Sequence, residues 1–469
     1  MTPPTLEALT IVELPYFEDS SHYFKKIRGL EWPIWLDSGH LKAQPNPHAR
    51  YDIISGAPHY KIITTAADCL CIPGKNAQDQ ATRKFANCWS AIEDLVPQTT
   101  KKCDLPFTGG ALGYLGYDLG RELENLKNTL PSDHDAPTSL LGIYNWGIIQ
   151  DHKLKTCSLI HNGNCTSEFA AQLIGLVESN APGTSVLPPF SATEFKANTQ
   201  QERYLSQIER IQDYIRAGDC YQVNFTQRFE ATFSGDTFEA YQRLRRQLPS
   251  PFSCYFETEY GAIMSLSPER FIACNDGRAT TQPIKGTSRR GCTPEEDLRL
   301  AEELRQSGKN QAENLMIVDL LRNDLSKSCS PNSVKTSKLF DLESYANVHH
   351  LVSTVHGQLQ PECTPLSLLK SCFPGGSITG APKIRAMEII EELENERRSI
   401  YCGSIGYIGF DGQMDTNIAI RTAATSLDRI FVWGGGGIVA DSTPSAEYEE
   451  SLVKIRRILE GLSERPDRA

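Results

Sequence analysis

The spacing of apolar residues divides the chain into a strand-rich first part and a mixed second part. Before residue 180, short apolar runs are broken by Gly, Pro and Asn, as at Tyr60–Ala66, Gly109–Leu119 and Ser139–Asp151. Such runs are typical of strands joined by turns. Residues 181–200 are rich in Pro, Ser and Thr and have no periodicity, which is typical of a linker.

The second part, residues 201–462, alternates between strand and helix patterns. Apolar residues recur on one helical face between Tyr204 and Ile215, which predicts a helix over 201–217. Further amphipathic patterns predict helices near 294–307, 311–325, 381–396 and 445–462. Strand patterns are expected at 260–266, 270–274, 278–284 and 429–434. Strand-rich segments bounded by such helices favour an α+β layered fold.

Composition narrows the class of protein. The chain has 469 residues, 47 Lys and Arg, and 58 Asp and Glu, so its formal net charge is −11. General nucleic-acid binding is disfavoured, because neutralising phosphates needs a basic surplus. No run reaches the roughly 18 apolar residues of a membrane span, and the first residues do not resemble a signal peptide. Fourteen cysteines without a CxxC pair indicate reduced thiols, so we expect a cytoplasmic protein.

An acidic and a basic residue flank an expected hairpin. Asn275–Gly277 is a turn signal between two strand patterns. A three-residue loop would bring Glu269 opposite Pro283 and Lys285 onto the same face, whereas a two-residue loop would separate the two side chains. A carboxyl group and an amine on one face could be an acid and a nucleophile, or an ordinary cross-strand ion pair.

Three glutamates lie where they could bind a cation. Glu313 begins an apolar stripe of the helix around 309–325. Glu447 and Glu450 are one turn apart on the last helix, with Lys454 on the same face. Carboxylates so placed can share Mg²⁺, with water and substrate oxygens completing its shell. The alternatives are a favourable first-turn charge and an exposed charge ladder.

Glycines and one arginine indicate places for anionic groups. Gly434–Gly437 follow a strand pattern, and glycines before Pro382 lead into a helix, so backbone amides there could meet a ligand. Arg421 interrupts an alternating strand and Tyr401 lies nearby in sequence, a pairing suited to a carboxylate. The alternatives are a plain strand-to-helix turn and an arginine that faces water. Together the motifs favour a small, multiply anionic substrate held on Mg²⁺.

The region from about 200 to 462 resembles the chorismate-utilising enzymes, which include anthranilate synthase component I, aminodeoxychorismate synthase component I, isochorismate synthase and salicylate synthase. The resemblance rests on ordered blocks: GDCYQVNFTQRF, SPERF, AENLMIVDLLRNDL, HHLVSTVHG, FPGGSITGAPKIRAME, YCGSIGYIG, DTNIAIRT and GGGGIVADSTPSAEYEES. LDSG at Leu36–Gly39 and GGALGYLGYDL resemble the family's N-terminal domain more weakly. The resemblance implies a large layered β-sandwich flanked by helices. It divides the chain into an N-terminal domain (10–180), a linker (181–200), a chorismate-binding catalytic domain (201–462) and a tail (463–469).

The resemblance also implies an activity. Lys285 matches the aminodeoxychorismate synthases, whereas anthranilate synthases carry Ala there. In that chemistry the lysine amine attacks C2 of chorismate, Glu269 matches the general acid that protonates the leaving C4 hydroxyl, and ammonia adds at C4. Gln222 stands where water-using members have a lysine base, which favours ammonia. We therefore expect 4-amino-4-deoxychorismate formation for 4-aminobenzoate and folate synthesis. Anthranilate formation and a catalytically dead regulatory subunit are the alternatives.

Further roles follow from the same resemblance. Glu313 and Glu450 match Mg²⁺ ligands, and Glu447 matches an outer-shell residue. Asn310 replaces an acid that many relatives carry, which removes one negative charge near the metal. His349 adjoins His350 and competes with it for one role. The positions that match substrate-binding residues are Tyr401, Arg421, Gly435, Gly437, Ser377, His350 and Lys454, with Gln222 beside them.

Partners are implied as well. Related synthases receive ammonia from a separate glutaminase subunit, and this chain has no GxCxG-type nucleophile of its own. Ser38, Pro251 and Tyr255 match the site where anthranilate synthase binds tryptophan. We therefore expect chorismate, a glutaminase and bound tryptophan as partners, and neither nucleic acid nor a membrane.

Overall fold

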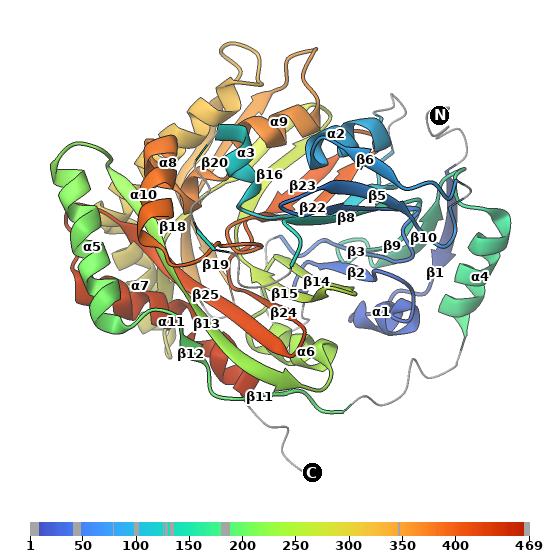
Figure 1. The fold of residues 1–469 in the computed structure, drawn as a ribbon, viewed down its shortest axis with the longest axis horizontal. Helices are drawn as coiled ribbons and strands as arrows, with labels where there is room; N and C mark the ends of the chain where they lie inside the picture. Colours follow the sequence, from blue (N-terminus) through green and yellow to red (C-terminus); the bar gives the residue numbers. More distant parts are fainter. Residues whose placement is uncertain are drawn as a thin grey trace.

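Two large antiparallel sheets form the centre of the molecule. The computed structural model describes residues 9–40, 48–77, 79–97, 103–124, 126, 130–131, 136–179, 188–345 and 348–463. The sheets lie against each other as layers, and helices cover their outer sides (Figure 1). This arrangement confirms the expected α+β sandwich flanked by helices.

Among the described residues the first sheet has thirteen strands and joins both halves of the chain. Its order is β1 (Thr10–Leu14), β10 (Thr156–His161), β9 (Trp146–Asp151), β3 (Tyr51–Ser55), β2 (Ile34–Asp37), β14 (Phe252–Thr258), β15 (Gly261–Ser267), β24 (Thr422–Ser426), β25 (Arg429–Ile438), β13 (Gln222–Ser234) and β11 (Ser191–Ala192), with β12 (Lys196–Ala197) and β21 (Gly380–Ala381) also on β13. The halves meet where Trp35 of β2 pairs with Tyr255 of β14.

The second sheet has twelve strands within the same described ranges. Its order is β18 (Ile284–Arg289), β20 (Val348–Gln358), β17 (Arg278–Gln282), β16 (Arg270–Asn275), β23 (Met414–Asn417), β22 (Ser404–Gly409), β7 (Gly110–Leu115), β8 (Ser139–Tyr144), β4 (Tyr60–Thr64), β5 (Cys69–Pro73) and β6 (Arg83–Phe85), with β19 (Lys335–Ser344) on β20. Here the halves meet where Gly113 of β7 pairs with Gly406 of β22.

Helices form at all five segments where amphipathic patterns predict them, and the described residues form further helices that were not predicted. The helices are α1 (Ser21–Ile27), α2 (Cys88–Leu95), α3 (Leu119–Glu124), α4 (Ser167–Glu178), α5 (Gln201–Arg216), α6 (Thr237–Gln247), α7 (Pro294–Gln306), α8 (Gly308–Ser326), α9 (Pro365–Cys372), the 3₁₀ turn η1 (Gly376–Ile378), α10 (Lys383–Leu393) and α11 (Pro444–Ser463). The five predicted ones are α5, α7, α8, α10 and α11. α7 begins where the Thr293 hydroxyl accepts from the Glu296 amide, directly before Pro294. In the described part of the chain, every helix is too short or too polar to cross a membrane.

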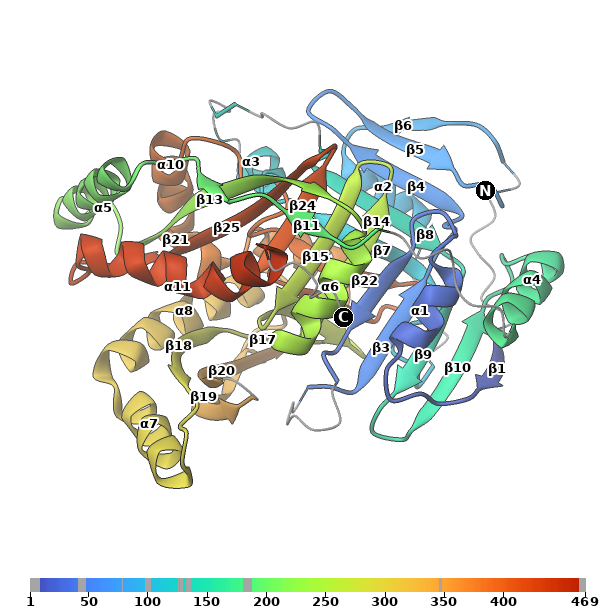
Figure 2. The same cartoon turned by 90° about the horizontal axis from the view of Figure 1, so that it is seen from below.

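Helices pack on the first sheet to support its glycine-rich strand. α11 crosses the outer side of β25, and α5 and α10 lie at one end of the same strands (Figure 2). A small apolar cluster of α5, α10, β13 and β25 includes Ile208, Val223, Ile390 and Ile438, all of which are buried. On the second sheet, α8 packs against β18 and β20. These contacts hold the N-terminal parts of α8 and α11 near β18 and β25.

Two local expectations need correction. Gly434–Gly437 do not follow a strand but lie within β25, where they pair with β13. Arg421, expected within a strand, lies just before one. β24 begins at Thr422, and Arg421 has a left-handed backbone with φ 51°. The segment Ser139–Asp151 forms two strands, and β8 and β9 belong to different sheets.

The expected division into domains stays a prediction. Both sheets contain strands from 10–180 and from 201–462. In the expected linker, residues 181–187 lie outside the described residues, while β11 and β12 add to the edge of β13. Most of the expected tail, residues 464–469, is also outside them.

Candidate active site

Two register irregularities lie in the strands near Glu269 and Lys285. Asp276 and Gly277 have positive φ, of 52° and 71°, so the turn has two residues and Asn275 pairs with Arg278. That register alone would place Glu269 and Lys285 on opposite faces. The bulge after Arg270 adds one residue to β16, so Arg270 pairs with Gln282. A second irregularity, in the pairing of β18 with β20, falls between Ile284 and Thr287 and includes Lys285 itself.

Glu269 and Lys285 are close enough to affect each other's ionisation. Burial raises the pKa of Glu269, although the Ser377 hydrogen bond and the charges of Lys285 and Lys454 oppose that rise. Burial lowers the pKa of Lys285, opposed by Glu269 and assisted by Lys454. A carboxyl group with a raised pKa therefore lies near an amine with a lowered pKa, which suits an acid and a nucleophile.

A cluster of charges lies over β25 at Gly436. A Cβ atom added to Gly436 would lie 3.3 Å from Lys454 Nζ, 3.4 Å from Glu447 Oε2 and 3.6 Å from Glu450 Oε1. Lys454 Nζ is 2.8 Å from Glu450 Oε1 and donates to the Gly435 carbonyl at 3.0 Å. The Ser442 hydroxyl donates to Glu447 at 2.7 Å. The glycine therefore leaves room for two carboxylates and an ammonium group on one face of the strand.

Glu313 reaches this cluster from α8. Its carboxylate lies 3.9 Å from Lys309 Nζ. The negative charges of Glu313 and Glu450 both raise the pKa of Lys285. Lys454 and Lys309 lower the pKa of Glu450, whereas burial and the charge of Glu450 raise the pKa of Glu447. Within the described ranges, no three His, Cys, Asp or Glu side chains are close enough together to form a ready metal site. Ion pairing with lysines holds Glu313 and Glu450 in place instead.

The inner side of β25 offers glycines and an unpartnered amide. A Cβ atom on Gly437 would lie 2.6 Å from Gln222 Nε2, so a larger residue there would displace the Gln222 side chain. Gln222 is 1 % exposed, and neither polar atom of its side chain has a hydrogen-bond partner among the described residues. Gly435 and Gly437 pair with Thr226 and Asn224 of β13. A buried amide without partners costs free energy unless a ligand completes its bonds.

Arg421 and Tyr401 lie near each other, as the carboxylate-clamp prediction requires. Burial lowers the pKa of Arg421, and Tyr401 counteracts this effect. Tyr401 is buried and stacks on Trp433, with ring centroids 5.8 Å apart and an angle of 6°. No hydrogen bond or ion pair joins the Arg421 guanidinium to another residue that the structure describes. A half-buried arginine without a counter-ion among the described residues, on a left-handed residue, is typical of an anion-binding position.

The two neighbouring histidines have different surroundings. His350 Nδ1 lies 2.9 Å from the Thr287 hydroxyl on β18, two residues after Lys285. Burial and the charge of Arg421 lower the pKa of His350 to about 3, so this imidazole is neutral. His349 instead contacts Asp297 of α7 at 3.0 Å. Because alternate residues of β20 face opposite sides, His350 is the one near the site.

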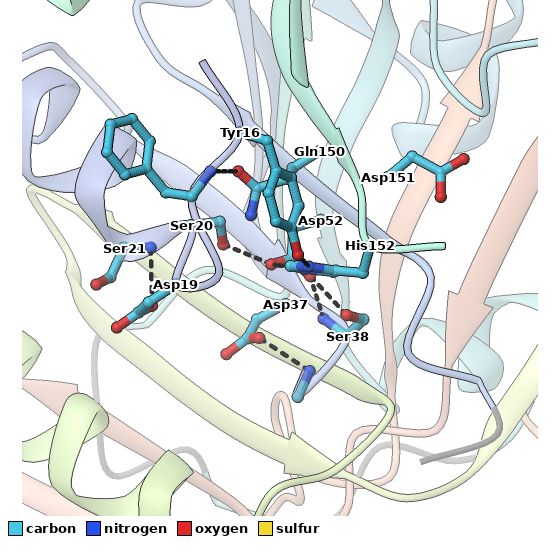
Figure 3. Close-up of polar contacts among 12 residues, drawn as sticks. Tyr16, Asp19, Ser20, Ser21, Asp37, Ser38, Asp52, Gln150, Asp151 and His152 are labelled. Atoms are coloured by element: carbon cyan, nitrogen blue, oxygen red, sulfur yellow. Dashed lines mark hydrogen bonds and ion pairs between the residues drawn. The ribbon is translucent and has the colours of Figure 1, made fainter. Parts of the chain in front are cut away.

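Ser38, Pro251 and Tyr255 lie in a different part of the molecule, where β2 of the N-terminal half pairs with β14 in the first sheet. The Ser38 amide and hydroxyl both donate to Asp52 Oδ1, at 2.8 Å and 2.7 Å (Figure 3). His152 Nε2 lies 2.9 Å from the other Asp52 oxygen, and Tyr16 lies 3.0 Å from His152 Nδ1. Tyr255 is buried among the rings of Phe24, Phe238 and Tyr241. Ser38 and Tyr255 are therefore engaged in hydrogen bonds and packing of their own, and Pro251 is buried.

Several residues near the site were missed by the sequence analysis. Lys309 precedes Glu313 by one helical turn, and that spacing was the available signal. Thr287 contacts His350 only because β18 pairs with β20, which no local pattern shows. Asn310, expected near the metal, lies against β18: a Cβ atom on Gly286 would be 3.0 Å from its Cγ.

Comparison with known proteins identifies the family of this chain. The sequence profile of the family described as chorismate binding enzyme matches residues 44–460. The chain belongs to the chorismate binding enzymes. Relative to aminodeoxychorismate synthase component 1 of Escherichia coli (strain K12), it is 41 % identical over 454 residues, which cover 96 % of this chain and 98 % of that protein. Relative to anthranilate synthase component 1 of Geobacillus stearothermophilus, it is 34 % identical, covering 89 % of this chain and 87 % of that one.

A solved structure of this family has the same fold. The crystal structure of anthranilate synthase component I from Streptococcus pneumoniae TIGR4 aligns with a TM-score of 0.78 and 31 % identity, over 88 % of this chain and 92 % of that one. The expected fold of the chorismate binding enzymes is therefore confirmed.

Proposed function

We propose that this chain aminates chorismate to 4-amino-4-deoxychorismate, which leads to 4-aminobenzoate and folate. Its similarity to aminodeoxychorismate synthase component 1 over nearly the whole length supports this function. The observation that carries the proposal is that Lys285 and Glu269 lie together, with the pKa of the amine lowered and the pKa of the acid raised.

The reaction balances with these two residues. The neutral amine of Lys285 forms a bond to C2 of chorismate while the bond between C4 and its hydroxyl breaks, and Glu269 donates the proton that makes the leaving group water. Ammonia then bonds to C4, the bond from C2 to Lys285 breaks, and Glu269 accepts the proton that the attacking nitrogen loses. The sum is chorismate plus ammonia giving 4-amino-4-deoxychorismate plus water.

The substrate residues bind the anionic groups of chorismate in this proposal. Arg421 and Tyr401 bind the enolpyruvyl carboxylate. The amides at Gly435 and Gly437, with Ser377, His350 and Lys454, surround the rest of the ring. Gln222 supports ammonia as the nucleophile because an amide cannot remove a proton from water.

Mg²⁺ fits the carboxylates over β25. Glu313 and Glu450 would hold the ion, and Glu447 would lie behind them. Mg²⁺ commonly binds through one or two carboxylates while water and substrate supply the other oxygens, so a complete cage of protein ligands is unnecessary. When bound, the ion would neutralise the ring carboxylate.

A glutaminase subunit is the proposed source of ammonia, in a complex located in the cytoplasm. The fourteen cysteines are free thiols, which suits a reducing compartment. Tryptophan binding by Ser38, Pro251 and Tyr255 remains a prediction. It requires these side chains to exchange present contacts for the ligand.

The test supplies the purified chain with chorismate, Mg²⁺ and ammonium, and identifies the product by mass. We expect 4-amino-4-deoxychorismate, which gives 4-aminobenzoate only after the corresponding lyase is added. Direct appearance of fluorescent anthranilate would instead assign the anthranilate activity. Glutamine should replace ammonium only when the glutaminase is present.

A further inference from the structure

A buried ion pair outside the predicted site connects several of its parts. Arg398, which is 1 % exposed, donates from Nε to Glu394 Oε2 at 2.9 Å and from Nη2 to Glu394 Oε1 at 2.6 Å. The guanidinium lies over the Tyr117 ring, 4.6 Å from its centroid. The two-point geometry and burial make this a rigid contact.

Arg398 also bonds to three other segments. Its Nη1 donates to the carbonyl of Ile378 at 2.8 Å, next to Ser377 in η1, and its Nη2 donates to the carbonyl of Asn224 at 2.6 Å. Its own carbonyl accepts from the Tyr401 amide at 3.0 Å. One residue is thus bonded to β13, to the turn that carries the Glu269 partner, and to the tyrosine of the carboxylate clamp.

Glu394 completes the connection to β13. Its Oε1 accepts from the Thr226 amide at 3.0 Å and from the Thr226 hydroxyl at 2.7 Å. Asn224 and Thr226 are the residues that pair with Gly437 and Gly435 of β25. The ion pair therefore fixes β13 at both positions opposite the proposed substrate glycines.

We propose that Arg398 and Glu394 are positioning residues, which hold Ser377, Tyr401 and the Gly435–Gly437 segment in one geometry around the substrate. This inference rests on the proposed function for the identity of the substrate. A planar guanidinium can serve several acceptors in fixed directions at once, whereas a lysine ammonium on a flexible stem cannot keep the same geometry.

The first test is Arg398→Lys, which retains the positive charge. We expect kcat to fall about 100-fold, the usual cost of a 1 Å misplacement in an active site, with a smaller rise in KM for chorismate. Arg245→Lys is the matched control. Arg245, like Arg398, is a buried arginine in an ion pair with a carboxylate, but its partner is Asp37 of the N-terminal half. The control variant should lower the melting temperature similarly and leave kcat unchanged.

A milder variant and a double-mutant cycle separate positioning from stability. Thr226→Val removes one hydrogen bond to Glu394 and keeps the ion pair, and we expect a fall of about threefold to tenfold in kcat. If Arg398 acts through Ser377, the two substitutions should not be independent. The double variant Arg398→Lys, Ser377→Ala should then show a smaller fold-decrease in kcat than the product of the fold-decreases of the two single variants.

The outcomes distinguish this inference from the proposed function. Wild-type kcat in Arg398→Lys, or equal kcat losses in Arg398→Lys and Arg245→Lys, would overturn the positioning role. The ratios between variant and wild type are measured on whichever chorismate product the wild type forms. If the wild type forms a different product, the proposed function is refuted, and the ratio of variant kcat to wild-type kcat still tests the positioning role.

Discussion

Asp52 in the N-terminal half and Glu269 in the catalytic half are both buried carboxyl groups, but their surroundings shift the pKa in opposite directions. His152, Ser20 and Ser38 all bond to Asp52 and hold its pKa well below the usual value, despite burial (Figure 3). Glu269 has one hydrogen bond from Ser377 and two more distant lysines, so burial dominates and the pKa rises.

The difference teaches how to separate structural polar groups from functional ones in this fold. In the N-terminal cluster donors and acceptors match, and the network contributes to stability without needing a ligand. Around Glu269, the side chains of Gln222 and Arg421 lack hydrogen-bond partners among the described residues. Polar groups without partners lower the stability of the free protein, and an anionic substrate that bonds to them would stabilise it.

Replacing the nucleophile should have the largest effect. Lys285→Ala should lower ammonia-dependent turnover about 1000-fold, because the covalent route is lost. Its thermal stability should not fall, since a desolvated amine is removed. Steady-state assays and a melting curve check both, with Lys338→Ala, an exposed lysine of β19, as the control. Full activity in the alanine variant would exclude the covalent mechanism.

Breaking the N-terminal network should affect stability and leave catalysis unchanged. Asp52→Ala leaves His152, Ser20 and Ser38 without their shared acceptor and should lower the free energy of unfolding by about 3 kcal/mol at pH 7. Denaturant unfolding measures the loss, and kcat at low temperature should match the wild type. A large kcat decrease in fully folded protein would mean that the two regions are coupled.

Removing a proposed metal ligand should weaken the response to Mg²⁺. In Glu450→Gln, the Mg²⁺ concentration for half-maximal activity should rise about tenfold or more. Glu449→Gln is the matched control, because it changes the neighbouring exposed residue of α11. If both variants titrate like the wild type, Glu450 does not bind the ion.

The smallest expected effect is a shift of the pH profile. Lys454 lowers the pKa of both Glu269 and Lys285, so Lys454→Met should raise both. Activity needs a neutral amine and a protonated acid. Both limbs of the profile should therefore move to higher pH, because both pKa values rise. Profiles of kcat/KM measure this, and a shift to lower pH would contradict the assignment.

Much of the fold and of the site was predictable from local sequence. The stripes of α5, α7, α8 and α11 and the alternation of the strands follow from burying apolar faces, and the structure confirms them. The ordered blocks identified the family and contain Glu269 and the three glutamates, and the resemblance between the blocks assigned Lys285 as well. Local patterns are sufficient to predict these features because each depends on the chemistry of one side chain or on the periodicity of one helix or strand.

Other features were decided only by tertiary structure. The Asn275–Gly277 signal predicts a hairpin, but the register near Glu269 and Lys285 also depends on irregularities after Arg270 and between Ile284 and Thr287. The choice of His350 over His349 depends on pairing between β18 and β20, and the Arg398–Glu394 contacts join segments more than 150 residues apart. The sequence by itself determined which groups and elements this protein has. Packing of distant segments determined which groups meet, because register, bulges and buried ion pairs are stabilised by contacts that no local pattern contains.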